Sequence, residues 1–194
     1  MENPVSTNRA PTAARRRRFD PERRARIIRA AVDVVGEIGV EKLTLRAVAA
    51  VADVPLGSMT YHFSNVDDLL VSALEMAAEE STAYWCRWGE ELPAGADLAE
   101  ELAILLERLT TGPARRQTAV ELDLYLASMR RPHLRSASLS LARIAYVTLE
   151  QHTDLDTARA LSFMSDGLVL EALASDRPLK RDECVAMLRR VFPH

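Results

Sequence analysis

Apolar residues recur at helical spacing along this chain of 194 residues, and this periodicity restricts the fold more than any other feature of the sequence. In the first such segment the apolar residues stand one, three or four positions apart: Ile27, Ile28, Ala31, Val34, Val35 and Ile38. This spacing gives a helix one apolar face. Aromatic residues make up only 5% of the chain, and no run of β-branched residues alternates with polar ones between hairpin dipeptides. The sequence therefore predicts an all-α fold.

Residues typical of helix ends divide the chain into segments. The first helix has Asp20 as its N-cap and Pro21 at its first position, and it ends near Gly39, a residue suited to a C-cap. After residue 63 we expect helices from Ser64 or Asn65 to about Ala77, and near 81–91, 97–110, 114–130, 134–151, 155–174 and 180–191.

Several classes of protein are disfavoured by what the sequence lacks. No stretch approaches the roughly 18 apolar residues that a membrane helix needs, and the basic N-terminus has no apolar signal core, so a cytoplasmic protein is expected. Cys86 and Cys184 stand far apart without neighbouring ligands, which argues against a disulfide framework or a metal site. Phosphate-binding glycine loops and catalytic serine motifs are missing. We therefore expect neither an enzyme nor a cofactor.

The formal net charge of -3 conceals an uneven distribution. Residues 1–63 hold 11 Lys and Arg against 7 Asp and Glu, a net charge of +4, which leaves 14 against 21, a net charge of -7, for the rest. This predicts that only the N-terminal part meets a polyanion. A polar arm, residues 1–19, contains Arg15, Arg16, Arg17 and Arg18, which either follow DNA phosphates or form a solvated tail.

The segment that follows the first helix, Thr44 to Phe63, is predicted to form two short helices joined by a sharp turn. Thr44 can cap a helix from Leu45 to about Ala52, Asp53 can adopt the positive φ of the turn, and Pro55 or Leu56 opens a second helix through Phe63. The residues expected to face inward are Val48, Ala52, Val54, Met59 and Phe63. Those left on the outer face of the second helix are Leu56, Gly57, Ser58, Thr60, Tyr61 and His62.

A helix pair of this kind either inserts its second helix into a DNA major groove or simply packs inside a helical protein. Hydroxyl and imidazole groups on the outer face can bond base edges or phosphates, and Leu56 can contact a thymine methyl group. The pattern thus predicts a helix-turn-helix between Leu45 and Phe63.

The segments IIRAAVDVVGEIG and LTLRAVAAVADVPLGSMTYHFSNVDDLL, in this order over about residues 20–80, resemble the DNA-binding domain of the TetR family of regulators. The resemblance implies that Thr44 and Arg46 touch phosphate and that Gly57, Ser58, Thr60, Tyr61 and His62 lie at the DNA. It also implies a DNA-binding domain over residues 20–65 and a helical domain over residues 66–194 for a small-molecule effector and dimerisation.

Three residues depart from the pattern of that family. Asp53 stands where the turn usually has glycine, Thr60 where tyrosine is common, and Val66 where a phosphate-binding lysine is common. Asp tolerates positive φ better than most residues. The other two departures remove contacts to the DNA backbone, which the arginine run of the arm could supply.

The segment DTARALSFMSDGLVLEALA resembles a dimerisation helix. One stripe of it holds Ala158, Leu161, Met164, Leu168 and Ala172, and its small residues are Ala160, Gly167 and Ala174. Together with Val185, Leu188 and Phe192 from the last helix, this stripe could build a four-helix interface in a homodimer. The alternative is that the stripe is ordinary core within one chain.

A ligand pocket in the C-terminal part would draw on its scattered aromatic and acidic residues. The candidate lining is Trp85, Trp88, Tyr125, Met129, Tyr146 and Phe163, with Tyr84 beside them, and the candidate polar anchors are Glu121 and Asp166, with Asp123 and His133 as further options. Aromatic residues at helical spacing equally well form core.

The excess negative charge of this part either favours a cationic or polar ligand or only keeps this part of the chain off DNA. The function expected is a homodimeric repressor that a small-molecule effector releases from a palindromic operator in double-stranded DNA. Control by a protein partner, activation instead of repression, and a helical protein-binding adaptor remain as alternatives.

Overall fold

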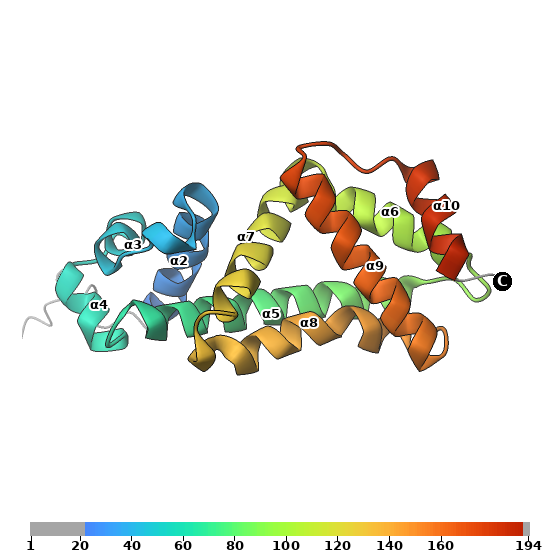
Figure 1. Ribbon diagram of the computed structural model, residues 1–194. Coiled ribbons are helices and arrows are strands. Elements are labelled where there is room, and N and C mark those ends of the chain that lie inside the picture. The colour runs from blue at the N-terminus through green and yellow to red at the C-terminus, as the bar shows by residue number, and fades with distance from the viewer. Residues whose placement is uncertain (1–21, 192–194) are drawn as a thin grey trace, which may run out of the picture.

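The computed structural model describes residues 22–191. Every regular element in this range is a helix, which confirms the all-α fold (Figure 1). The helices are α2 (Arg23–Ile38), α3 (Leu45–Val51), α4 (Leu56–His62), α5 (Val66–Glu91), α6 (Leu98–Thr110), α7 (Gly112–Ser128), α8 (Arg135–Leu149), α9 (Leu155–Ala174) and α10 (Arg181–Val191), with single 3-10 turns η1 (Val40–Lys42) and η2 (Pro132–Leu134).

Helices α2, α3 and α4 form a small head at one end of the molecule, and α5 runs from this head into the larger part, where it lies along α8 (Figure 1). The expected caps at Asp20 and Pro21 lie outside the described residues, and α2 ends at Gly39, whose φ is 81°. Gly39 N–H donates to the carbonyl of Val35 over 2.9 Å. No helix among the described residues is both long and apolar enough to cross a membrane.

Helix α5 corrects one expectation, because it is continuous over 26 residues where two helices were expected. The residues between Ala77 and Ser81 include no glycine or proline, and the alanines and glutamates there are good helix formers. Its start is well capped: Asn65 Oδ1 accepts from Asp68 N–H over 2.9 Å, and Asp68 Oδ2 accepts from Ser64 N–H over 3.0 Å.

Two clusters of buried apolar residues form the core. The first fills the head around Ile27, Met59 and Leu70 and also takes in Val120 and Leu124 of α7. The second lies among α6, α8, α9, α10 and the distal part of α5. The head is therefore packed not only on α5 but also on α7.

The apolar stripe of α9 that was expected to form the dimer interface is buried within the protomer. Four of its five residues are buried in the protomer, namely Ala158, Leu161, Leu168 and Ala172, and Met164 packs partly buried against the second cluster. Val185 and Leu188 are buried as well, while Phe192 lies outside the described residues. The alternative, that this stripe is core, is the correct one, because α9 packs against α6, α8 and α10 on that side.

Candidate nucleic-acid interface and adjoining pocket

Helix α4 has one buried side and one exposed side, as expected for a recognition helix. Met59 and Phe63 are buried in the head, whereas Leu56 and Tyr61 are 44% and 84% exposed. Gly57 and Thr60 are exposed beside them, and Ser58 and His62 are half-buried. The structure thus separates the residues expected to touch DNA from those that hold the helix in place.

The turn and the first short helix also have the expected geometry. Asp53 has a φ of 51°, in the left-handed region. Thr44 Oγ1 accepts from Ala47 N–H over 3.1 Å and so caps α3, while Arg46 is exposed. Val66 packs partly buried against the core of the head. Arg15, Arg16, Arg17 and Arg18 lie outside the described residues.

Two arginines of α2 contact the ends of the two short helices of the motif. The guanidinium of Arg24 stacks over the ring of Phe63 at 5.3 Å and donates to Ser72 Oγ over 2.9 Å. Arg26 Nε donates to the carbonyl of Ala52 over 3.2 Å at the end of α3. A recognition helix held this way presents its outer face with little conformational freedom left to lose on binding.

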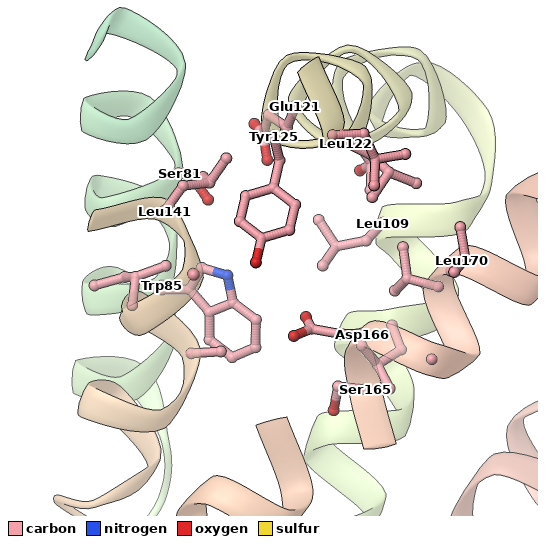
Figure 2. Close-up of a pocket in the computed structure, with 18 of the residues that line it drawn as sticks. Ser81, Trp85, Leu109, Glu121, Leu122, Tyr125, Leu141, Ser165, Asp166 and Leu170 are labelled. Atoms are coloured by element: carbon pink, nitrogen blue, oxygen red, sulfur yellow. The ribbon is translucent and has the colours of Figure 1, made fainter. Parts of the chain in front are cut away.

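A pocket of about 340 Å³ lies in the larger part, with α5, α6, α7, α8 and α9 around it (Figure 2). Most of its walls are apolar or aromatic, with Trp85 and Tyr125 facing each other across the space (Figure 2). The aliphatic side chains of the wall are those of Leu106, Leu109, Leu122, Leu126, Leu141, Ile144, Val169 and Leu170.

Two carboxylates stand on opposite walls of this apolar pocket, Glu121 on α7 and Asp166 on α9. Burial raises the pKa of Glu121 to about 7, although hydrogen bonds from Gln117, at 3.2 Å, and from Ser81 oppose the shift. Burial likewise raises the pKa of Asp166 to about 6. Asp166 as a whole residue is exposed to solvent, but its carboxylate points into the pocket (Figure 2). Within the described part of the chain, no cationic side chain forms an ion pair with either group.

Five of the eight candidate ligand-binding residues line this pocket: Trp85, Glu121, Tyr125, Met129 and Asp166. The other three do not. Trp88 packs edge-on against Trp85 with ring centroids 5.5 Å apart, Tyr146 lies under the guanidinium of Arg159 at 5.6 Å, and Phe163 is 67% exposed on the outside of α9.

The further polar options and Tyr84 are used elsewhere. Asp123 Oδ2 accepts from Val40 N–H over 2.8 Å, and His133 Nε2 lies 3.6 Å from Asp67 Oδ1. Tyr84 lies under the guanidinium of Arg108 at 6.0 Å.

The sequence did not indicate the leucines and the serines of the pocket wall as ligand-binding residues. One signal was present in α7, which is apolar on two sides. Val120 and Leu124 face the head, while Leu122 and Tyr125 face the pocket. A helix with two apolar faces needs neighbours on both sides. The second apolar face of α7 forms one wall of the pocket.

Helix α7 is also bonded directly to the head. Besides the bond from Val40 to Asp123, Arg116 Nη2 donates to the carbonyl of Asp33 over 3.2 Å. Just beyond the helix, Arg131 approaches Glu41 and Asp67 at 3.5 and 3.6 Å. The same helix that carries Glu121 into the pocket therefore contacts the segment that precedes the recognition motif.

Two family models match the chain. One, described as bacterial regulatory proteins of the tetR family, matches residues 27–73, and the other, a tetracyclin repressor-like C-terminal domain, matches residues 93–194. A search of curated proteins found no match.

Solved structures with this fold include those of the multidrug binding protein EbrR. Its complex with imidazole is 44% identical in sequence and covers 89% of this chain and 96% of its own, with a TM-score of 0.78. Its complex with ethidium is 42% identical and covers 88% and 98%, with a TM-score of 0.76. A TetR family member from Streptomyces coelicolor A3, SCO1917, is 43% identical and covers 88% and 98%, with a TM-score of 0.75.

Proposed function

Since the chain belongs to the TetR family of transcriptional regulators, we propose that it is a homodimeric repressor that leaves its operator when a small aromatic cation binds in the pocket. Residues 20–65 bind the operator in this proposal, and residues 66–194 bind the effector and a second copy. The observation that carries the proposal is the pair of carboxylates, Glu121 and Asp166, on the walls of an otherwise apolar and aromatic pocket.

The class of effector follows from the chemistry of the walls. A carboxylate kept in apolar surroundings without a cationic partner is costly, and a ligand that brings a positive charge removes that cost. Trp85 and Tyr125 add aromatic faces that attract cations and stack on flat rings. The ligands of EbrR support this class, since ethidium, proflavin and malachite green are all aromatic cations.

Operator recognition rests on the outer face of α4. Tyr61 and Thr60 stand exposed near its C-terminal end, and Gly57 leaves room for close approach, because a Cβ added there would meet no atom within 4 Å. A single helix of this size contacts few base pairs, so selective binding calls for two copies on a palindromic site.

Release from DNA follows if the effector favours a conformation in which the two heads no longer match their half-sites. Helices α5 and α7 both line the pocket and both pack on the head, so a shift of either one moves the recognition helix. By linkage, DNA weakens effector binding by the same factor as the effector weakens DNA binding.

The ligand class is tested with ethidium and the variants Glu121→Gln and Asp166→Asn. Each substitution removes a charge at nearly constant volume, and ethidium affinity should fall by about tenfold or more, which corresponds to about 1.4 kcal/mol. Glu75→Gln, an exposed position on α5, is the matched control and should bind as the wild type does. Equal affinity of all four proteins for ethidium would contradict the proposed class.

The pH dependence of ethidium affinity provides a second test of the ligand class. The charge of ethidium does not change near neutral pH, so wild-type affinity should rise as pH increases through the pKa of Glu121, about 7. Glu121→Gln should flatten that rise. A profile that is equally steep in the variant would assign the titration to another group.

The operator is found by selecting bound fragments from random DNA, and a palindromic consensus is the expected result. Dye-induced release must then be separated from the effect of an intercalator on DNA itself. Glu121→Gln serves this purpose, because release through the pocket requires more dye in the variant, whereas release through DNA distortion is the same for both proteins.

A further inference from the structure

One arginine joins the start of α7 to the end of α9. Arg115 Nη1 donates to the carbonyl of Ala172 and Nη2 donates to that of Leu173, each over 3.4 Å. Nη2 also donates to Asp176 Oδ1 over 2.7 Å, in the turn that follows α9. Within residues 22–191, every hydrogen bond and ion pair between α7 and α9 or that turn comes from this guanidinium. Arg115 therefore forms the polar junction of the two helices.

The junction is a helix C-cap that a second helix supplies. The last carbonyls of an α-helix have no partner within the helix, and a cation beside them also interacts favourably with the helix dipole. Ala172 and Leu173 belong to the last turn of α9, and Arg115 belongs to the first turn of α7. The exposed ion pair with Asp176 adds a contact that salt screens. Arg115 thus fixes the end of α9 to the start of α7.

Helices α7 and α9 form two walls of the pocket and spread apart from this junction (Figure 1). Glu121 lies six residues after Arg115, and Asp166 lies six residues before Ala172. At 1.5 Å per residue, each of these two acidic positions is about 9 Å from the junction along its helix. A change of about 10° in the angle between the helices therefore changes the distance between the two positions by up to about 1.6 Å.

The walls are open at the end away from the junction. Leu126 and Met129, farther along α7, line the pocket and are 44% and 62% exposed. In the part of the chain that the structure describes, no hydrogen bond or ion pair ties this end of α7 to α9. The angle between the walls therefore depends on the contacts at their junction.

Building on the ligand class proposed above, we propose that Arg115 is a positioning residue of the effector pocket. Its bonds to the last turn of α9 set the spacing of Glu121 and Asp166 and thereby decide how thick a cation the pocket accepts. Arg115 does not line the pocket, so it acts on the ligand only through the two walls. Loss of its bonds lets the walls separate, which weakens the contacts of a flat ligand more than those of a thick one.

The proposal is tested through selectivity between two dyes. Proflavin is a flat cation of three fused rings, whereas malachite green has three separate rings twisted out of one plane. Arg115→Gln removes the charged, forked donor, and we expect the ratio of proflavin affinity to malachite green affinity to fall by about tenfold. Arg115→Lys keeps the charge and a donor for one carbonyl, so its ratio should lie between those of Arg115→Gln and the wild type.

Arg181→Gln is the matched control. Arg181 Nη2 donates to Glu100 Oε2 over 3.2 Å and so joins α10 to α6, and neither residue lines the pocket. Loss of this link should leave the ratio of the two affinities unchanged. Circular dichroism verifies that the variants are folded, and Arg115→Lys decides the question if Arg115→Gln does not fold.

The spacing of the walls is also measured without a ligand, through quenching of Trp85 fluorescence by acrylamide in a Trp88→Phe background. The chain has only these two tryptophans, so the signal then comes from the pocket wall alone. We expect stronger quenching in the Arg115 variants than in the parent protein, and no change in Arg181→Gln.

Two results overturn the inference. If the affinity ratio of the Arg115 variants equals that of the wild type, or if Arg181→Gln shifts the ratio as far, Arg115 does not determine selectivity. If the quenching of Trp85 is the same with and without Arg115, the junction does not hold the walls in place. Failure of the wild type to bind either dye would overturn the proposed ligand class instead, and the quenching results would still decide whether Arg115 positions the walls.

Discussion

At the scale of single residues, Asp53 shows how the recognition motif departs from its family without losing its geometry. Its φ of 51° places it in the left-handed region, which costs most side chains about 1 kcal/mol or more. Aspartate is among the residues that enter this region most readily, because its short polar side chain can bond locally. The turn therefore forms without the usual glycine.

Substitutions at this position should separate backbone strain from side-chain contacts. Asp53→Ala should lower the free energy of unfolding by about 1 kcal/mol, whereas Asp53→Gly should not lower it, because glycine has no Cβ to clash. Urea denaturation measures both. Glu79→Ala, at an exposed helical position of α5, is the control and should leave stability nearly unchanged, because glutamate and alanine are both good helix formers. Equal losses for Asp53→Ala and Asp53→Gly would attribute the effect to the carboxylate instead.

Glu121 makes stability depend on pH in the absence of ligand. Its pKa in the folded protein, about 7, lies above its ordinary value of 4.5, so the native state binds this proton more tightly than the unfolded state. The free energy of unfolding should therefore fall as pH rises from about 4.5 to 7. At pH 8 we expect Glu121→Gln to be more stable than the wild type by on the order of 1–2 kcal/mol, and at pH 4 the advantage should vanish. Thermal unfolding at the two pH values measures this, and a pH-independent difference would contradict it.

At the scale of elements, α7 joins the pocket to the head. Glu121 and Tyr125 reach into the pocket, whereas two positions from each of them Asp123 accepts the N–H of Val40. That bond fixes the turn η1, which leads into Thr44 and the recognition motif. A displacement of α7 by a ligand therefore pulls on the segment just ahead of α3.

Removal of this bond should weaken communication between the two sites. Asp123→Ala leaves the N–H of Val40 without its acceptor, so we expect a loss of about 1–3 kcal/mol in stability and a smaller effect of ethidium on operator affinity. Asp123→Asn keeps an acceptor oxygen and should retain most of both. The measurement is operator binding with and without dye for the three proteins, and an unchanged dye effect in Asp123→Ala would exclude this route.

The helices themselves could be predicted from the sequence, but their packing partners could not. Helical periodicity and caps predicted the all-α fold and both short helices of the motif, because these signals are local. Periodicity placed Leu161 and Leu168 correctly on one apolar face of a helix. It could not tell whether helices of the same chain or of a second copy pack on that face, and the structure shows that α6, α8 and α10 of the same chain do. Phe163 failed as a pocket residue for the same reason, since its direction depends on how α9 packs.

At the scale of the whole molecule, charge separates the part that meets DNA from the part that does not. Residues 1–63 carry a net charge of +4 and the remainder carries -7. Because an acidic body is repelled by the phosphate backbone, we expect the chain to approach DNA with its head first. At the start of α5, Val66 packs on the core of the head instead of offering a cation to phosphate.

The arginine arm should compensate for the cation that Val66 does not supply. Replacement of Arg15, Arg16, Arg17 and Arg18 by alanine should weaken operator binding and reduce the slope of log affinity against log salt by as much as about 3.6 for each subunit of the bound dimer, or about 0.9 for each phosphate that an arginine neutralises. Titrations of operator DNA at several salt concentrations measure the slope. A slope equal to that of the wild type would show that the four arginines are only a solvated tail.

The unbroken length of α5 has a mechanical consequence. At 1.5 Å per residue, its 26 residues form a rod about 39 Å long, with the recognition motif at one end and Trp85 near the other. Each degree of tilt about the distal end moves the head by roughly 0.7 Å. In the homodimer proposed above both rods would swing, and their displacements would add across a half-site separation of about 34 Å. Under that proposal, a pocket ligand needs to tilt the rods by only a few degrees to put the two heads out of register with DNA.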